Sequence, residues 1–285
     1  MSLVVTGASG HLGRLTVQSL LDRGVPAERI VATARTPETL ADLADRGVAV
    51  RQADYTDPQS LKEAFTGAER VLLVSSSAIG QRIDQHRNVI DAARDAGVDL
   101  IVYTSAPRAD TTEMLLAAEH AATEQMVRDS GLDYVILRNS WYFENYTGQL
   151  ATALEHKAIL GSAGTGRVSA ASRADYAEAA AVVLAGDGPR NHIYELGGDT
   201  AFTLSEYAET LSALVGETVA YVDQPAADYQ AFLESVGLPE PVARIMADAD
   251  LALARGDLQV ESGDLSRLLG RPTTSLSDAI REALA

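Results

Sequence analysis

The 285-residue sequence contains no cysteine and only two lysines, Lys62 and Lys157. The absence of cysteine excludes disulfides, thiolate metal sites and cysteine nucleophiles, and it fits the reducing environment of the cytoplasm. No stretch approaches the roughly 20 continuous apolar residues that a membrane span needs. The amino-terminal residues MSLVVTGASG also lack the basic segment of a signal peptide. We therefore expect a cytoplasmic protein that makes no membrane contact.

Basic side chains are scarce relative to acidic ones, with 23 Lys and Arg residues against 40 Asp and Glu residues. The resulting net charge of −17 argues against binding to duplex nucleic acid or to an anionic membrane surface. A generic acidic globular protein accounts for this charge. The hydrophobic fraction of 46% is sufficient for a substantial core.

Short apolar runs alternate with amphipathic, helix-like segments through the first half of the chain. Runs of Val, Ile and Leu separated by helices are typical of a parallel sheet that is covered on both faces. Right-handed crossovers place the carboxyl ends of such strands at one edge, where ligands bind. We predict strands at residues 3–5, 30–34, 48–51, 71–74, 100–104 and 134–137, and helices near residues 12–23, 37–46, 58–66, 81–96 and 114–130.

Beyond about residue 150 the pattern becomes mainly helical. We predict a first domain at residues 1–150, which also receives a strand from about 190–197, and a smaller lobe at 151–285 beside the substrate cleft. The cleft follows from analogy with other proteins of this fold class. Within the lobe we predict helices at residues 175–184, 204–215, 226–235, 240–254 and 276–284, with β-like runs at 192–196 and 218–223.

The strongest motif is a G-x-x-G-x-x-G turn between the first predicted strand and the first predicted helix. Gly7 permits the tight turn, Gly10 lets backbone N–H groups approach a pyrophosphate, and Gly13 lets the helix pack on the sheet. The helix amino terminus then faces the phosphates. This indicates an α/β protein with a Rossmann-type, doubly wound parallel sheet and a mainly helical carboxyl-terminal lobe; a glycine turn without a ligand is the alternative. The predicted cofactor contacts are Thr6, Gly7, Ala8, Ser9, Gly10, His11, Leu12 and Gly13.

Arg35 ends the second predicted strand, where an NAD site usually carries Asp or Glu for the ribose diol. A guanidinium at this place can pair with the 2′-phosphate of NADPH and stack on adenine. A solvated arginine at a strand end is the alternative. No acidic residue occurs at positions 33–36, which favours NADPH over NADH.

Polar residues follow the third and fourth predicted strands. Asp54 can accept a hydrogen bond from the adenine amino group, and Tyr55 adjoins it. Each of these residue types is also common in loops, so the prediction depends on their shared place at strand ends. We predict that Asp54, Tyr55, Ser75, Ser76 and Ser77 contact the cofactor.

Several stretches of the chain resemble the NmrA-like atypical short-chain dehydrogenases. Within that family they are most similar to the branch of bacterial NADPH:quinone oxidoreductase 2 and triphenylmethane reductase. The resemblance covers essentially the whole chain and implies NADPH binding and the reduction of quinones or similar conjugated acceptors without flavin. The matching stretches are residues 6–13, 51–55, 85–90, 103–105, 137–142, 172–177 and 235–239.

The chain departs from ordinary short-chain dehydrogenases because it has no Tyr-x-x-x-Lys pair. Pro58 and Ala153 stand four residues before Lys62 and Lys157. Reduction of an ordinary ketone by a proton-donating tyrosine is therefore not expected. Quinone reduction is compatible with this loss, because the product phenolate is delocalised and less basic than an alkoxide, so a hydrogen-bond donor can stabilise it.

Residues after the fifth and sixth predicted strands are the candidates for the acceptor site. Ser105, Asn139 and Tyr142 are predicted to act in catalysis, with Asn139 also contacting the nicotinamide carboxamide or an acceptor oxygen. Ser140 and Trp141 are predicted cofactor contacts, and Trp141 can offer a flat wall to an aromatic acceptor. Alternatively, the aromatic residues simply pack the junction of the lobes.

His120 lies near the place of the helix-borne catalytic lysine of plant reductases in the same superfamily. Its imidazole can donate a hydrogen bond or a proton, so it is a catalytic candidate. We favour the alternative that it is a surface histidine beside Glu119 and Glu124. These two acids do not share one helical face with His120, so we expect no metal site.

Three classes of function remain open. The first is a flavin-free, NADPH-dependent quinone reductase, and the second is a non-catalytic NADP(H) sensor of the NmrA type that acts through protein contacts. The third is a reductase or isomerase of another small metabolite. The sequence is compatible with a homodimer.

Overall fold

The computed structural model describes residues 2–285, which form two compact units. The first consists of residues 2–106, 119–139 and 173–194, and the second of residues 107–118, 140–172 and 195–285. Helix α8, Arg173–Ala185, therefore belongs to the first unit. The sequence division at residue 150 assigned this helix to the smaller lobe.

The first unit is built on a seven-stranded sheet with the order β3-β2-β1-β4-β5-β6-β8. The pairs from β3 across to β6 are parallel. Asn191 donates to Tyr134 O and Ser140 to Leu196 O, so β8 runs in the same direction as β6. The predicted doubly wound α/β fold is confirmed. The strands are β1 Ser2–Val5, β2 Ile30–Ala34, β3 Ala49–Gln52, β4 Ala68–Leu73, β5 Leu100–Ser105, β6 Asp133–Asn139 and β8 His192–Leu196.

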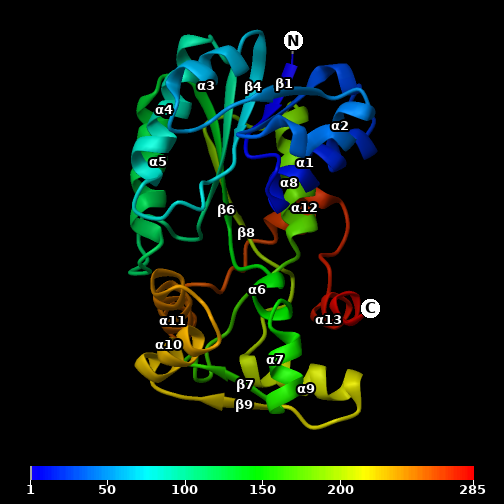
Figure 1. Ribbon diagram of the computed structural model, residues 1–285, viewed down its shortest axis with the longest axis vertical. Coiled ribbons are helices and arrows are strands. Elements are labelled where there is room, and N and C mark those ends of the chain that lie inside the picture. The colour runs from blue at the N-terminus through cyan, green and yellow to red at the C-terminus, as the bar shows by residue number, and fades with distance from the viewer. Residues whose placement is uncertain (1) are drawn as a thin grey trace. The chain divides into compact units, whose positions relative to one another are not determined.

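Helices cover both faces of this sheet, with α4 and α5 on one side and α1 and α8 on the other (Figure 1). Alternate strand residues such as Val4, Val71 and Ile101 pack with Phe65 and Val89 in one fully buried core. The predicted helix near residues 37–46 consists of a 3₁₀ turn, Pro37–Leu40, followed by the short helix α2. The helices are α1 His11–Asp22, α2 Ala41–Asp45, α3 Pro58–Ala64, α4 Arg82–Asp95, α5 Ala117–Asp129 and α8 Arg173–Ala185.

Helices α1 and α8 pack closely against each other. Helix α8 is rich in alanine, and Ala177, Ala180 and Ala181 are completely buried. Small side chains let two helix backbones approach each other closely, so α8 packs against α1 on the same face of the sheet. This packing is the physical reason that α8 belongs to the first unit.

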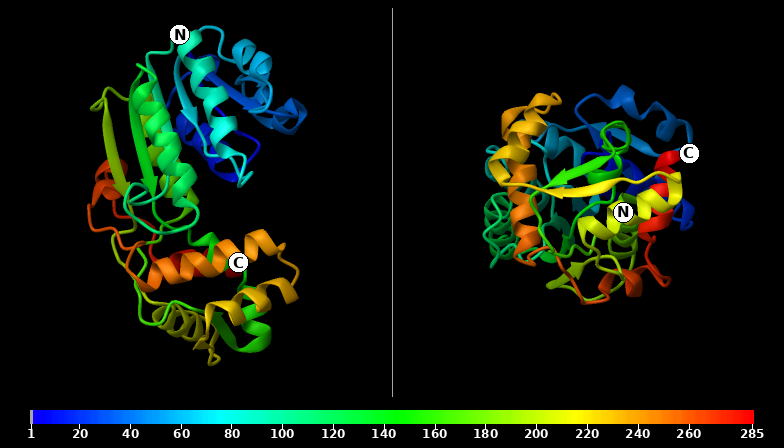
Figure 2. Two further views of the ribbon diagram at one scale, coloured as in Figure 1. Left: turned by 90° about the vertical axis from the view of Figure 1, so that its left-hand side faces the viewer. Right: turned by 90° about the horizontal axis from the view of Figure 1, so that it is seen from below.

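The second unit holds a two-stranded parallel sheet of β7 and β9, whose arrows run side by side in the right panel of Figure 2. Strand β7, Ala158–Gly161, pairs with strand β9, Ala220–Asp223. No helix of residues 2–285 is long and apolar enough to cross a membrane. The helices of this unit are α6 Glu144–Thr147, α7 Leu150–His156, α9 Leu204–Val215, α10 Ala226–Ser235, α11 Glu240–Ala254, α12 Asp264–Leu269 and α13 Leu276–Leu284.

Candidate active site

The glycine turn joins β1 to α1 as the motif predicts. Gly7 has a φ of +60°, which is the left-handed region that favours glycine. The turn closes with a hydrogen bond from Gly10 N to Gly7 O of 3.0 Å, and Ala8 N donates to Thr33 O on β2 at 2.8 Å. The turn is thus fixed at the carboxyl ends of β1 and β2.

The other two glycines of the motif are required for different reasons. A Cβ on Gly13 would lie 2.6 Å from Gly7 O and 2.9 Å from Gly7 C, so no larger residue fits between α1 and the turn. A Cβ on Gly10 would meet only Gly7 O within 4 Å among the described atoms beyond its neighbours, at 3.3 Å. Gly10 also has an extended backbone with φ of −84° and ψ of 165°. The fold therefore constrains Gly10 less than Gly13, with one tight contact for a Cβ, and the close approach of a ligand would be a further reason for glycine there.

The amino terminus of α1 is open to an anion. No side chain of the described residues caps it, and its first turn carries no acidic residue. The N–H groups of the first helical turn have no partner within the helix, and the helix dipole favours negative charge there. With the bare backbone at Gly10, this arrangement fits the diphosphate of a dinucleotide.

The hydroxyls of Thr6 and Tyr55 form hydrogen bonds next to the glycine turn. The buried Thr6 hydroxyl donates to Leu72 O at 2.9 Å and accepts from Val74 N at 3.1 Å. Because the Thr6 proton goes to Leu72 O, the Tyr55 hydroxyl is the donor in a short hydrogen bond to Thr6 Oγ1, and it also lies 2.9 Å from Val74 O. Burial raises the pKa of Tyr55 above its ordinary value, so the phenol stays protonated. These two hydroxyls tie β1 and β4 to the loop after β3.

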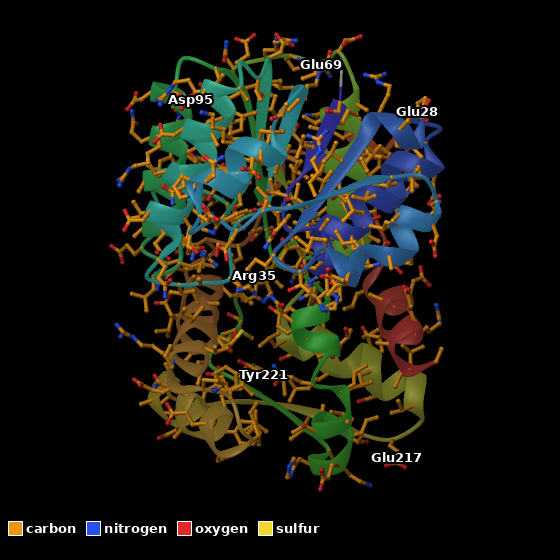
Figure 3. All side chains as sticks on the ribbon, turned by 45° about the horizontal axis from the view of Figure 1, so that its top comes forward. Glu28, Arg35, Glu69, Asp95, Glu217 and Tyr221 are labelled. Atoms are coloured by element: carbon orange, nitrogen blue, oxygen red, sulfur yellow. The ribbon has the colours of Figure 1, made fainter. Side chains whose placement is uncertain are left out.

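Arg35 follows β2 directly and is exposed. It lies at the opposite edge of the first unit from Glu28, Glu69 and Asp95 (Figure 3), which lie at the edge where the strands begin. Within residues 2–285 its guanidinium makes no hydrogen bond or ion pair, so it is available to a phosphate. Asp54 accepts from Thr56 N and Oγ1, both at 2.8 Å. These bonds, followed by the charge of Arg35, hold the pKa of Asp54 below its ordinary value.

The segment of Ser75, Ser76 and Ser77 after β4 is held by buried polar side chains. Ser75 N donates to Thr104 Oγ1 on β5 at 2.9 Å, and Ser76 N donates to His86 Nε2 on α4 at 2.9 Å. The Ser76 hydroxyl donates to Gln85 Oε1 at 2.5 Å. These contacts fix the path of the backbone at the edge where the cofactor is expected.

His86 is a neutral acceptor in this arrangement. Its Nε2 accepts from Ser76 N, so the ring proton lies on Nδ1, which is 2.9 Å from Thr123 Oγ1. The Thr123 hydroxyl in turn donates to Glu119 O. Burial, followed by the nearby charge of Arg82, lowers the pKa of His86 to about 3. The histidine therefore bridges α4, α5 and the serine segment without carrying charge.

His120 is buried, with 4% of its surface exposed, so the surface interpretation is wrong. Its Nδ1 lies 2.7 Å from Tyr103 OH, and its Nε2 lies 3.4 Å from Arg82 Nη1. Because the guanidinium can only donate, Nε2 is the acceptor and Nδ1 carries the proton. Burial, then the charges of Arg82 and His86, lowers the pKa of His120 well below its ordinary value. The imidazole is neutral and serves as a hydrogen-bonding group.

Ser105 and Glu124 belong to a buried ion-pair cluster. Glu124 is fully buried and accepts from Ser105 Oγ at 2.7 Å, from Arg138 Nε at 2.8 Å and from Arg128 Nη2 at 2.7 Å. The expectation that Glu124 and His120 lie on different helical faces is wrong, because a spacing of four residues is about one turn. Both side chains point inward from α5 to separate partners. Within residues 2–285, no group of three or more His, Cys, Asp or Glu side chains could hold a metal.

The four candidates at the end of β6 and directly after it fall in two units. Asn139 is buried at the end of β6 in the first unit, and Ser140 begins the second. Ser140 Oγ donates to Leu258 O at 2.9 Å. The backbone of Trp141 accepts from Ala171 N at 3.1 Å, and Tyr142 forms a parallel bridge with Ala171. Trp141 is 9% exposed and Tyr142 is half-buried.

Comparison with known proteins identifies the family. A family model described as NAD(P)H-binding matches residues 7–187. The chain is 47% identical to quinone oxidoreductase 2 of Escherichia coli over 98% of its own length and 97% of that protein. It is 28% identical to an NmrA-like family domain-containing oxidoreductase of Aspergillus flavus, over 100% of this chain and 95% of that protein. The chain belongs to the NmrA-like NAD(P)H-binding family.

Solved structures of other family members agree with this assignment. The crystal structure of the E. coli NADPH-dependent quinone oxidoreductase complexed with NADPH matches with a TM-score of 0.96, at 46% identity over 99% of both chains. The triphenylmethane reductase of Citrobacter sp. complexed with NADP(H) matches with a TM-score of 0.94, at 37% identity over 99% of this chain and 100% of that one. The resemblance predicted from the sequence is confirmed.

In this family member, sequence reasoning missed the polar groups that hold the serine segment. They are His86, Gln85 and Arg82 of α4, Thr104 of β5 and Thr123 of α5. A signal was present on α5, where Ala117, His120, Glu124 and Val127 recur at a helical spacing of three and four residues and are all buried. Polar residues on an apolar helical stripe indicate buried, partnered groups.

Proposed function

We propose that the chain is an NADPH-dependent reductase of quinones and similar conjugated acceptors. The observation that carries the proposal is the glycine turn, where the backbone at Gly10 is bare and the amino terminus of α1 has no side-chain cap. Similarity over nearly the full length to the E. coli quinone oxidoreductase, whose structure contains NADPH, supports the same cofactor and reaction class.

The residues at the sheet edge are suited to hold the cofactor. The open amino terminus of α1 and the bare backbone at Gly10 would receive the diphosphate. The exposed guanidinium of Arg35 would pair with the 2′-phosphate, as a charge-assisted bond between planar donors and a phosphate allows. Ser76 and Ser77 would border the cofactor, and His86 accepts a hydrogen bond from the backbone N–H of Ser76. Bound NADPH supplies a hydride.

The chain's own residues are expected to position the acceptor rather than to protonate it strongly. The pKa values of His86 and His120 are both lowered, so neither imidazole is a cationic acid near neutral pH. A quinone needs no such acid, because the phenolate formed is delocalised and water can protonate it. We propose Asn139 and Tyr142 as hydrogen-bonding groups for the acceptor.

Ser105 and His120 are proposed to act through other groups. The Ser105 hydroxyl is engaged with Glu124, and the His120 ring is engaged with Tyr103 and Arg82. Their role would be to hold the end of β5 and the serine segment in the geometry that near attack on the acceptor requires.

Anaerobic oxidation of NADPH tests this function. The protein is mixed with benzoquinones, naphthoquinones, a triphenylmethane dye and aliphatic ketones, and the loss of NADPH absorbance is followed. We expect turnover with quinones, slower or no turnover with ketones, and a strong preference for NADPH over NADH. Tight NADP(H) binding without turnover of any acceptor would instead indicate the non-catalytic sensor.

We further propose a cytoplasmic location and a homodimer as the finer properties of this reductase. The complete absence of cysteine supports the first, since a reducing compartment places no demand on disulfides. Cell fractionation and sedimentation of the purified protein test the two statements separately. Recovery of a monomer alone at micromolar concentration would contradict the dimer.

A further inference from the structure

The second unit contains a small pocket between α7, β7, α9 and α10, with a volume of about 40 Å³. Its deep wall includes the buried side chains of Ala153, Ile159, Tyr207 and Tyr229. Its rim includes His156, which is exposed. The pocket is therefore apolar within and reaches solvent at one side.

Two phenol groups of this pocket have no hydrogen-bond partner. The hydroxyls of Tyr146 and Tyr207 are buried, and neither meets a donor or an acceptor among the described residues. Tyr207 is 2% exposed as a whole. Burial raises the pKa of both tyrosines above the ordinary value, so both hydroxyls remain protonated and can donate. Buried polar groups in proteins are normally satisfied, and an acceptor supplied from outside the chain would satisfy these two.

The walls indicate that the rest of the ligand is aromatic. The rings of Tyr146 and Tyr207 lie 5.6 Å apart and tilted by 41°. Phe202 supports them from behind, with its ring 6.0 Å from Tyr146 and 6.5 Å from Tyr207. At the rim, the rings of His156 and Phe232 meet edge to face at 6.5 Å. Such ring surfaces favour a flat aromatic partner.

The negative charge of ionised Asp250 near the pocket disfavours an anionic ligand. Asp250 is buried, and its charge adds to burial, the larger cause, in raising the pKa of Tyr146 and Tyr229. Its own carboxylate accepts from Ser162 N at 2.7 Å. A carboxylate or phenolate ligand would be repelled by Asp250 at pH values above about 7, where that side chain is ionised despite its burial. A neutral carbonyl oxygen would accept from the phenols without that penalty.

We propose that this pocket binds the carbonyl edge of a neutral, planar aromatic ketone or quinone, with Tyr207 and Tyr146 as hydrogen-bond donors. A volume of about 40 Å³ exceeds the 10–15 Å³ or so that one water needs and is well below the roughly 150 Å³ of a cavity that encloses benzene. The pocket therefore takes one edge of the ring, and the remainder of the ligand lies at the rim against His156 and Phe232. The choice of a quinone as ligand rests on the proposed function.

The test is direct binding of 1,4-naphthoquinone to the full chain without NADPH, measured by calorimetry. Because the chain has no cysteine, thiol addition to the quinone cannot imitate binding. Tyr207→Phe removes one hydroxyl and leaves the ring, so we expect affinity to fall by about 2- to 12-fold, the factor for one hydrogen bond. Naphthalene, which has no carbonyl, should bind the wild type and this variant equally weakly. 1-Naphthoate should bind more weakly than the quinone.

Tyr221→Phe is the matched control. The Tyr221 hydroxyl, on β9 in the same unit, donates to Asp223 Oδ1 at 2.7 Å and accepts from Ala163 N at 2.9 Å. Its removal should lower thermal stability and leave the affinity for 1,4-naphthoquinone unchanged. Tyr207→Phe removes an unpartnered hydroxyl, so it should not lower thermal stability.

Equal affinity of the wild type and Tyr207→Phe for 1,4-naphthoquinone would overturn the inference, because the Tyr207 hydroxyl would then not contact the quinone. The proposed function is judged separately by NADPH turnover. If the wild type turns over quinones and Tyr207→Phe does so with the same KM, the proposed pocket is contradicted and the proposed function is supported. If the protein binds 1,4-naphthoquinone through Tyr207 but never oxidises NADPH, the proposed function is contradicted and the proposed pocket is supported.

Discussion

Replacement of Gly10 separates the needs of the fold from the needs of the ligand. In Gly10→Ala, the new Cβ would lie 3.3 Å from Gly7 O and meet nothing else of the described chain within 4 Å. The residue caps α1 with an extended backbone that alanine adopts freely. The free energy of unfolding should therefore fall by no more than about 1 kcal/mol, the usual cost of a poorer helix cap.

Binding of NADPH should respond much more strongly to the same change. The second glycine of the motif lets the backbone N–H groups of the turn approach the diphosphate, so we expect a Cβ at this position to hold the phosphates away from them. Loss of two charge-assisted hydrogen bonds, at about 1.5–3 kcal/mol each, corresponds to an affinity decrease on the order of 100-fold or more. Gly10→Val should abolish binding of NADPH and NADH alike.

Gly13→Ala is the contrasting variant, because its Cβ would lie 2.6 Å from Gly7 O. Overpacking of this kind typically costs about 1–3 kcal/mol, so this variant should lose stability before it loses binding. Thermal unfolding and calorimetric titration with NADPH, measured on both variants, give the comparison. Normal folding of Gly10→Ala together with wild-type affinity for NADPH would show that the ligand does not require glycine at this position.

Three further predictions concern charge. Arg35→Ala should weaken the binding of NADPH by roughly 1–3 kcal/mol in calorimetric titrations and leave the binding of NADH unchanged. An equal loss of affinity for both cofactors would show that Arg35 does not discriminate between NADPH and NADH. Ser105→Ala should lower the free energy of unfolding by about 1.5–3 kcal/mol, because Glu124 loses a donor, and an unchanged denaturation midpoint would contradict this. Burial raises the pKa of Asp250 to about 7, so the folded state holds this proton more tightly than the unfolded chain. The stability of the wild type relative to Asp250→Asn should therefore fall as pH rises from about 4 to 7, by up to about 1.4 kcal/mol per pH unit, and parallel pH profiles in urea would argue against it.

Much of the fold could be predicted because local signals agree with it. Helix α9 ends where Gly216 takes a left-handed conformation, and α10 and α11 begin after Pro225 and Pro239. Their bounds match the predicted ones. Strand β7 was missed because its four residues pair with β9 alone, and nothing in their local sequence distinguishes them from a loop. Tertiary pairing decides such a segment.

In the candidate site, too, some features could be predicted from local sequence, whereas others depend on tertiary packing. The place of the glycine turn between β1 and α1, and of Arg35 directly after β2, could be predicted because both depend on neighbours in the sequence and on the end of a strand. The cofactor contacts assigned to them stay predictions. The hydrogen bond of His86 to Thr123 joins residues 37 positions apart and depends on the packing of α4 on α5. The acids beside His120 suggested a surface position, whereas Glu124 is itself buried against Arg138.

The packing of α8 on α1 has a consequence for synthesis of the protein. Helix α1, whose amino terminus we propose as the diphosphate site, packs against a segment that begins at Arg173, more than 150 residues later. At about 5–20 residues per second, a ribosome needs roughly 8–32 s to cover that interval. During that time the apolar back of α1 has no permanent cover, so a nascent chain stalled before Arg173 is expected to be a strong substrate for chaperones.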